Sequence, residues 1–436
     1  GRESVLWGGT AALGFESPWT DLGLTYTRSQ ATDYTVTRTV DDSLYDRDTG
    51  AGTLWRSQSL HYSERSTETL MLQAEHPWFF LPDEMPVFGW ERLTFLPPVT
   101  DWSVSRNTAR QYEPDRRLFN DVYNNGYWRG PSGGLYPLER RWRDIEESGW
   151  QYALNQKIPF RQWTGDEGYI KAGLFRDAVT RTYEQDTFNY EQGNVGSSFQ
   201  GGPDDLWSDT FLTGYPVIDG PAGLQRGWHV APGDTDIDYR GQQEIRAWYV
   251  MGDLPLTSFL SVMGGARVET TDISARMRPS KGVYDSNFSV LSIQTDQNGS
   301  EYVNKLRIGS DDELAEHTPD LDQRDVLPAL GIKLSPADNL NLRLNWSKTI
   351  ARPTFKELMP VEFKESAASA TYFGNPRLKM SDVENYDVRI EFMPAQGQIW
   401  SASYFYKKLT DPIDMRAYNG YIEGEMFITP VNYPEG

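Results

Sequence analysis

The chain has 436 residues, with 62 acidic and 42 basic side chains and a formal net charge of −20. This charge argues against a nucleic-acid partner, which requires a basic surface. The absence of cysteine excludes a disulfide framework and thiol chemistry. No run of about 18 apolar residues occurs, so the sequence encodes no membrane-spanning helix.

The first half of the chain contains segments in which apolar and polar residues alternate. These segments lie near residues 5–15, 22–26, 58–80, 87–112, 150–160 and 169–190. Period-two alternation predicts β-strands with one apolar and one polar face. Turns are predicted at Pro18-Trp19, 81–86 and 164–168, and loops are predicted at 41–53 and at the Gly-, Asn- and Pro-rich residues 113–138.

The second half continues the alternation after a predicted loop that ends near Tyr239. Strands are predicted near 241–251 and 257–278, joined by a turn at 252–255 and followed by a loop near 281–322. Four more alternating segments follow, at 326–334, 340–350, 386–392 and 400–406. The turns at 335–338 and 395–397 are tight, whereas residues 353–381 form a long connection.

About twelve strands result, and short and long connections alternate between them. Aromatic residues gather beside the short turns, as expected for an interfacial girdle. This rhythm is typical of an all-β fold, a transmembrane antiparallel up-and-down β-barrel with short periplasmic turns and long extracellular loops. The alternative is a β-sandwich, in which Greek-key crossovers would break the rhythm.

Four motifs within residues 323–413 carry a family resemblance. They are 347–353 (SKTIARP), 373–379 (FGNPRLK), Asn385-Tyr386-Asp387 with Glu391, and 405–408 (FYKK). In order and spacing this stretch resembles the late barrel of TonB-dependent outer-membrane receptors. Residues 64–69 with Glu75-His76, 101–103, 113–115 and 264–269 are similar to earlier parts of the same barrel.

The resemblance implies active uptake of a scarce solute through a plugged barrel in the bacterial outer membrane. Plugged outer-membrane transporters have about 22 strands. Residues 1–436 are therefore expected to be a partial barrel within one β-barrel domain, with the plug and both barrel ends outside this chain. Such a piece keeps two open sheet edges, so it is expected not to form a stable closed barrel alone.

The partners that the resemblance implies are the outer-membrane lipid, the TonB–ExbB–ExbD energy complex acting through the plug, and a small solute. A ferric siderophore or an oligosaccharide is expected as the solute, while cobalamin, haem and nickel complexes stay open. No nucleic acid is expected.

No catalytic site, metal site or cofactor is predicted. The four histidines lack metal-ligand spacing, and no nucleophile motif is present. The many carboxylates single out no acid/base pair. Asp234-x-Asp236-x-Asp238 resembles the start of a calcium loop but lacks its Gly and terminal Glu, so a solvated acidic loop is favoured.

Substrate-binding candidates are aromatic residues of the predicted external loops and one arginine: Tyr123, Tyr127, Trp128, Trp142, Trp207, Trp228 and Arg352. Flat aromatic faces bind sugars, haem-like rings and aromatic siderophores alike. The alternative is that these rings pack within their own loops. Arg352 is expected to hold an anionic ligand or to pair with neighbouring acids. The charged residues predicted to line the lumen and face the plug are Arg343, Asp387, Arg389 and Glu391.

The leading hypothesis is therefore a TonB-dependent transporter. The second is a secreted β-sandwich carbohydrate-binding protein or glycoside hydrolase, which would need no detergent. The third is a non-transporting surface receptor or adhesin with the same barrel, in which solute would not accumulate at the expense of energy.

Overall fold

The computed structural model describes residues 1–41, 54–87, 89–124, 126–129, 138–192, 203–206, 218–220, 223–225, 228–233, 236–279, 289–308, 310–363, 370–420 and 426–435. Its elements are β1 (Arg2–Ser17), β2 (Thr20–Asp41), β3 (Leu54–Pro77), β4 (Met85–Val87), β5 (Trp90–Phe95), β6 (Val99–Asn124), β7 (Tyr127–Arg129), β8 (Leu138–Arg161), β9 (Glu167–Gln192), α1 (Pro203–Leu206), β10 (Ile218–Gly220), β11 (Gly223–Gln225), β12 (Trp228–Pro232), β13 (Ile237–Thr257), β14 (Leu260–Pro279), β15 (Ser289–Thr295), β16 (Glu301–Arg307), α3 (Asp311–Glu316), β17 (Asp320–Ala337), β18 (Leu340–Ala351), α4 (Phe355–Leu358), β19 (Thr371–Tyr372), β20 (Ser381–Phe392), β21 (Trp400–Thr410), β22 (Ile413–Asn419) and β23 (Met426–Asn432).

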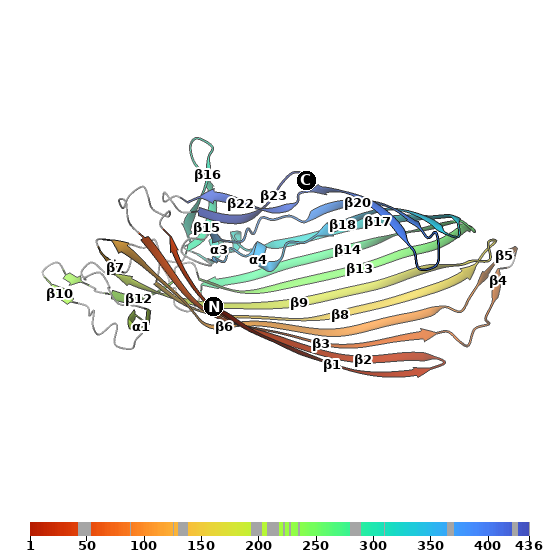
Figure 1. The fold of residues 1–436 in the computed structure, drawn as a ribbon, viewed down its shortest axis with the longest axis horizontal. Helices are drawn as coiled ribbons and strands as arrows, with labels where there is room; N and C mark the ends of the chain where they lie inside the picture. The colour runs from red at the N-terminus through yellow and green to blue at the C-terminus, as the bar shows by residue number, and fades with distance from the viewer. Residues whose placement is uncertain are drawn as a thin grey trace.

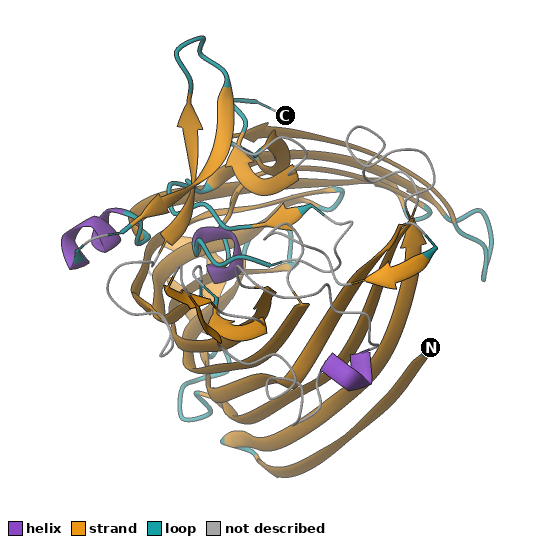
Figure 2. Ribbon diagram, turned by 90° about the vertical axis from the view of Figure 1, so that its left-hand side faces the viewer, coloured by secondary structure: helices purple, strands orange, loops and turns teal. Residues whose placement is uncertain are grey.

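One long antiparallel sheet dominates the molecule (Figure 1). Its strand order is β1-β2-β3-β6-β8-β9-β13-β14-β17-β18-β20-β21. The long strands are therefore paired in the order in which they follow one another along the chain, which is up-and-down topology. Figure 2 shows that the sheet curves around an interior. β1 and β21 are the two ends of the strand order and do not pair with each other, so the sheet stays open. The predicted partial barrel and its number of long strands are confirmed.

The strand register places apolar side chains in rows across the outer face of the sheet. Leu13, Leu24, Leu72, Val104 and Tyr152 are cross-strand partners from β1 to β8. Leu13 stays 74% exposed and Leu72 36% exposed, although both are large and apolar. Exposed apolar surface this continuous is unusual on a soluble protein and marks a face that meets an apolar environment.

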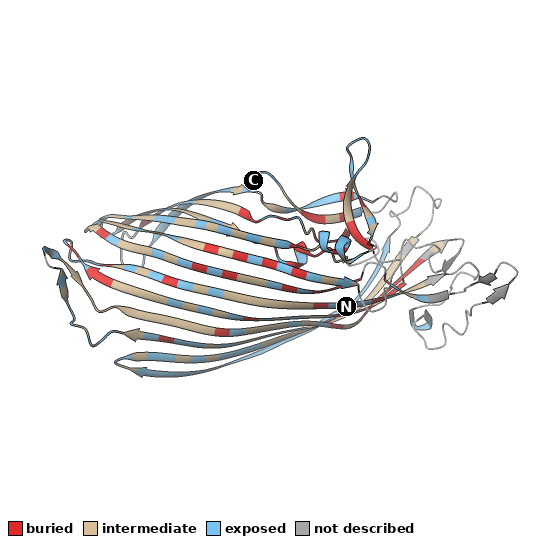
Figure 3. Cartoon of the chain, turned by 180° about the vertical axis from the view of Figure 1, so that it is seen from behind, coloured by how far each residue is buried: buried red, intermediate tan, exposed pale blue. Residues whose placement is uncertain are grey.

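The opposite face of the same strands is polar or carries small residues, as in the cross-strand row Gly14, Gly23, Gln73, Ser103 and Ala153. Figure 3 shows how exposure alternates along many of the strands. Among the described residues, no second sheet covers the apolar face, as a sandwich would require. In the same part of the chain, no helix is long and apolar enough to span a bilayer.

The short turns gather at one end of the sheet, and several lie where they were predicted. β1 and β2 are joined at Pro18-Trp19, and Gly165 and Gly397 adopt positive φ in the β8–β9 and β20–β21 turns. The turn predicted at 252–255 is wrong, because these residues extend β13 to Thr257. Pro255 tolerates this position beside a register shift, where a strand does not require its N–H.

Two further predictions about connections are wrong. Residues 113–138 are not all loop, because β6 continues to Asn124 and pairs with β3 and β8, and β7 folds back antiparallel onto its end. Residues 81–86 do not form a simple turn: they lead into the β4–β5 hairpin, whose Phe95 pairs with Phe160 of β8. Polar residues can continue a strand where each backbone group finds a partner on both sides.

The long connections on the opposite end carry structure of their own. The predicted loop before Tyr239 contains α1, the β10–β11 hairpin and β12, which pairs with β9. The predicted loop at 281–322 contains the β15–β16 hairpin and α3. The predicted loop at 41–53 lies almost wholly outside the described residues.

We predict that the apolar rows contact lipid. A charged side chain introduced on the outer face should therefore destabilise the fold more than the same side chain introduced on the inner face. Leu72 lies five residues from the short-turn end of β3, about halfway up the apolar band. Leu72→Arg in the full-length receptor should cost about 2–4 kcal/mol of unfolding free energy in lipid vesicles. The adjacent, inward Gln73→Arg should cost well under half of that. Equal losses in reversible denaturant unfolding would contradict this assignment.

Candidate ligand-binding region at the long-loop end of the lumen

The connection between β18 and β20 folds into the interior at the long-loop end. We call its described residues, 352–363 and 370–380, the inward segment. α4 begins after Thr354, whose side chain accepts from the backbone N–H of Glu357 while the Glu357 carboxylate accepts from that of Thr354. This capping box satisfies both groups at the start of a helix of only one turn.

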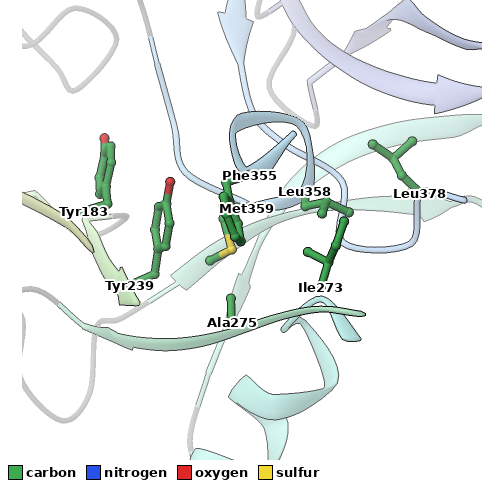
Figure 4. Close-up of a cluster of buried hydrophobic side chains, with 8 residues drawn as sticks. All are labelled: Tyr183, Tyr239, Ile273, Ala275, Phe355, Leu358, Met359 and Leu378. Atoms are coloured by element: carbon green, nitrogen blue, oxygen red, sulfur yellow. The ribbon is translucent and has the colours of Figure 1, made fainter. Parts of the chain in front are cut away.

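α4 buries its apolar residues against the inner wall of the sheet (Figure 4). Phe355, Leu358 and Met359 pack with four wall residues and with Leu378 of the same segment. The wall residues are Tyr183 of β9, Tyr239 of β13, and Ile273 and Ala275 of β14. Leu358 and Met359 are at most 1% exposed, so the segment is part of the folded core and not a free external loop.

The family-like motif at 373–379 closes this inward fold. The backbone N–H of Asn375 donates to the Glu357 carbonyl at 2.6 Å, and the Tyr372 hydroxyl donates to the Lys356 carbonyl at 3.0 Å. A Cβ on Gly374 would overlap the carbonyl oxygen of Met359. Only glycine lets the two stretches of backbone approach so closely.

Beneath the inward segment, five side chains form a chain of polar contacts, which we call the ionic cluster: His61, Glu113, Arg143, Gln185 and Asp236. The first four belong to β3, β6, β8 and β9, and Asp236 directly precedes β13. The His61 ring lies 3.5 Å from the Glu113 carboxylate, and Arg143 lies 3.4 Å from the same oxygen. Arg143 also donates to the Gln185 side-chain oxygen at 2.8 Å, and the Gln185 amide donates to Asp236 at 2.7 Å.

The ionic cluster is buried: Glu113 is 2% exposed and Arg143 is 6% exposed. Burial acts to raise the pKa of Glu113, but hydrogen bonding from His61 and the charge of Arg143 outweigh it and lower this pKa to about 2. The Glu113 carboxylate is thus charged at neutral pH, and its contribution to stability is lost only as the pH falls through about 2.

The ionic cluster also holds the inward segment. The guanidinium of Arg143 lies 5.1 Å from the centre of the Phe363 ring, and Lys356 lies 5.6 Å from the same centre. Cations over an aromatic face are attracted by the negative charge of the ring face. Lys356 is exposed and lies 4.9 Å from the Tyr372 ring. One cation between two rings can bind an anionic solute that carries flat groups.

The predicted binding residues do not come together in one site. Tyr123 and Trp128 form a pair with ring centres 5.4 Å apart, and Arg56 lies over Trp128. Trp142 lies next to Phe188 and, since it alternates with Arg141 and Arg143 on β8, points away from the ionic cluster. Trp207 and the side chains of Tyr127 and Trp228 lie outside the described residues. Their role in binding stays a prediction.

Arg352, at the start of the inward segment, has partners in β14. It forms an ion pair with Glu269 and donates to the Thr271 hydroxyl at 3.0 Å. Arg352 was expected either to hold an anionic ligand or to pair with neighbouring acids, and the structure shows a pair with an acid. Binding of an anion by Arg352 stays a prediction. The lumenal residues Arg343 and Arg389 both contact Glu391, at 3.3 and 2.8 Å.

The predicted solvated acidic loop at 234–238 is wrong for its described residues. Asp236 and Asp238 are 4% and 5% exposed. Asp236 accepts hydrogen bonds from Thr187 and Gln185, and Asp238 accepts from the backbone N–H of Gln185. Both carboxylates therefore join the start of β13 to β9. The described residues contain no group of three potential ligands that could hold a metal ion.

Sequence reasoning missed the ionic cluster. The segment before Trp150 carries charges on both parities, including Arg140, Arg141, Arg143 and Asp144, so it lacks the apolar parity that marks the lower strands. This loss of pattern is a usable signal: the strand continues beyond the apolar band, where both faces can be polar.

We predict that Gly374→Ala displaces the inward segment. The added methyl group collides with backbone, so overpacking should cost about 1–3 kcal/mol of unfolding free energy. Gly14→Ala is the matched control, because a Cβ there has nothing within 4 Å. Protease cleavage within residues 352–380 should rise only in the first variant. Cleavage that is unchanged in both would contradict the close packing.

We predict that Glu113→Gln leaves Arg143 buried without its carboxylate and costs about 3 kcal/mol. The control is Glu146→Gln, which removes a carboxylate from an exposed ion pair with Arg110 on the opposite face. Such a pair contributes at most about 1 kcal/mol. Denaturant unfolding in detergent measures both, and equal losses would show that the ionic cluster contributes no more than a surface pair.

Comparison with known proteins gives the family. A family model described as TonB dependent receptor-like, beta-barrel, matches residues 86–435. No curated protein matches the chain.

Among solved structures, the chain is similar to the ferric yersiniabactin uptake receptor FyuA of Yersinia pestis, with 10% identity and a TM-score of 0.36 over 95% of this chain and 55% of that one. It is also similar to the hemophore receptor HasR of Serratia marcescens, with 10% identity and a TM-score of 0.41 over 98% and 58%. The siderophore receptor PirA of Pseudomonas aeruginosa gives 10% identity and a TM-score of 0.35 over 100% and 61%.

The chain thus spans less than two thirds of the length of each of these receptors. The family match agrees with the predictions of a receptor barrel and of a protein that is not an enzyme. The match extends over most of the sequence, from the β4–β5 hairpin to the end of the described residues, and the chain belongs to the TonB-dependent receptor-like β-barrel family.

Proposed function

We propose that this chain forms part of the wall of an outer-membrane transporter that takes up a scarce anionic solute of the ferric siderophore class. The observation that carries the proposal is the division of one sheet into an apolar outer face and a polar inner face. Lipid on one side and water on the other require this division.

The polar inner face suits a separate plug. Arg343, Arg389 and Glu391 project from neighbouring strands β18 and β20, and both arginines stay exposed in this chain. Exposed charges on a lumen wall can dock a removable domain without a large apolar contact. We propose that a plug binds here and that the TonB–ExbB–ExbD complex moves it, because transport against a gradient needs an external source of energy.

The solute class is proposed from the inward segment. Lys356 lies between Phe363 and Tyr372 at the mouth of the lumen, where it can attract an anion and stack it against flat rings. Ferric complexes of aromatic siderophores combine negative charge with flat chelating groups. Neutral oligosaccharides would gain less from a lysine at this place.

The test is accumulation of labelled ferric siderophores in cells that express the full-length receptor, with and without the inner-membrane energy complex. We expect accumulation only when the complex is present. Accumulation that is independent of the complex, or binding without accumulation, would overturn the transporter and favour a surface receptor or adhesin.

Lys356→Ala tests the position of the site. We expect binding of the accepted ferric siderophore to weaken about tenfold, which is the loss of one charge-assisted contact of about 1.4 kcal/mol. The matched control is Lys348→Ala on β18, where Lys348 pairs with Asp382 at 3.3 Å. Equal affinities of the two variants in equilibrium binding to whole cells would place recognition elsewhere.

A further inference from the structure

A row of arginines borders the apolar outer face. Arg176 of β9 and Arg246 of β13 are direct cross-strand partners, and the row continues through Thr270 of β14 to Arg324 of β17. The neighbouring row toward the short turns is apolar and consists of Leu174, Trp248, Val268 and Val326. All these side chains share the outward parity of the exposed Leu174 and Trp248.

The height of the row matches the edge of a membrane. Arg176 and Arg246 lie about ten residues along their strands from the short turns. At about 3.3 Å per residue and a strand tilt near 40°, this is roughly 25 Å, the height of the apolar band of outer-membrane barrels. Because the short turns mark the inner side, the row lies at the level of the outer-leaflet headgroups.

The two rows enclose a groove on the outer surface. It has a volume of about 320 Å³ and is lined by Arg176, Arg246, Arg324, Thr270, Leu174, Trp248 and neighbouring residues. One side of the groove is therefore cationic and the other apolar. An amphipathic molecule with an anionic head and acyl chains has the same division.

The charges in the groove are only partly compensated. Glu244 lies between two of the arginines, 2.7 Å from Arg176 and 2.9 Å from the Nε of Arg246. Arg324 has no ion pair within the described part of the chain. The next row away from the short turns is acidic. Glu244 of β13 is the cross-strand partner of Asp272 of β14, and Asp272 is the partner of Asp322 of β17. The arginines themselves, and not an overall positive field, must therefore supply the attraction.

We propose that this groove binds the phosphate groups of a phosphorylated lipid of the outer leaflet, whose acyl chains lie on the apolar row. Guanidinium groups bind phosphate through paired, charge-assisted hydrogen bonds. Arginines held on three strands of a rigid sheet offer several such donors with little loss of freedom. The proposal rests on the proposed outer-membrane location and does not depend on what the receptor transports.

The experiment compares two triple variants of the full-length receptor in detergent. One is Arg176→Gln with Arg246→Gln and Arg324→Gln. The matched control is Arg240→Gln with Arg276→Gln and Arg278→Gln, which removes the same charge from exposed arginines of β13 and β14 farther from the short turns. Native mass spectrometry measures binding of bisphosphorylated lipid A and of its dephosphorylated form, in a chelating buffer that prevents cations from bridging to Asp272 and Asp322.

We expect the unmodified receptor and the control variant to bind the phosphorylated lipid equally, and the groove variant to bind it at least about tenfold more weakly. The dephosphorylated lipid should bind all three proteins weakly and alike. Equal binding of both lipids to the unmodified receptor, equal binding by the two variants, or displacement by an equal concentration of inorganic phosphate would overturn the proposal. Heat-induced unfolding of each variant verifies its fold, and the uptake assay stays an independent readout of transport.

Discussion

The structure depends on one constraint: a sheet whose outer face is apolar must pair its backbone groups from strand to strand, because lipid offers no hydrogen bonds. Long antiparallel neighbours meet this need across the curved sheet, with an unbroken register in the β8–β9 and β9–β13 pairs. The alternation of apolar and polar side chains follows from strand geometry, because successive side chains point to opposite faces of the sheet. Every residue that faces lipid has chain neighbours that face the lumen, so one strand serves two solvents.

Beyond the apolar band, the interior is shaped by packing and charge. The inward segment replaces lumenal water with an apolar contact between α4 and the walls of β9, β13 and β14. The ionic cluster lies below it, and Phe363 joins the two through Arg143. The motif residues that carry the family resemblance act here as structure: Asn375 and Gly374 hold the returning chain against α4. This packing holds the backbone on both sides of Lys356, the residue for which we propose a role in solute binding.

Much of the fold follows from sequence pattern, because lipid imposes period two where it touches a strand. The alternation therefore predicts which residues face outward in 340–350 and 386–392. It also predicts the turns that interrupt it, at Pro18-Trp19 and at 395–397. The alternation of apolar and polar residues no longer marks a strand beyond the apolar band. There, residues 113–124 continue β6 with water or protein on both faces. The candidate site depends on contacts between residues far apart in sequence, such as His61 with Glu113, and no local pattern reports them. Trp142, one of the aromatic binding candidates, contacts Phe188 of β9; the role of the aromatic candidates in solute binding stays a prediction.

The most direct measurement of the central claim uses the absence of cysteine in this chain. Single cysteines at Leu70, Met71, Leu72 and Gln73 of β3, each carrying a nitroxide, can be placed in lipid vesicles within the full-length receptor. The account predicts that collision with oxygen, which concentrates in lipid, is high at 70 and 72, and that collision with a water-soluble nickel complex is high at 71 and 73. Accessibility without this alternation, or with the two parities exchanged, would contradict a sheet that separates lipid from water.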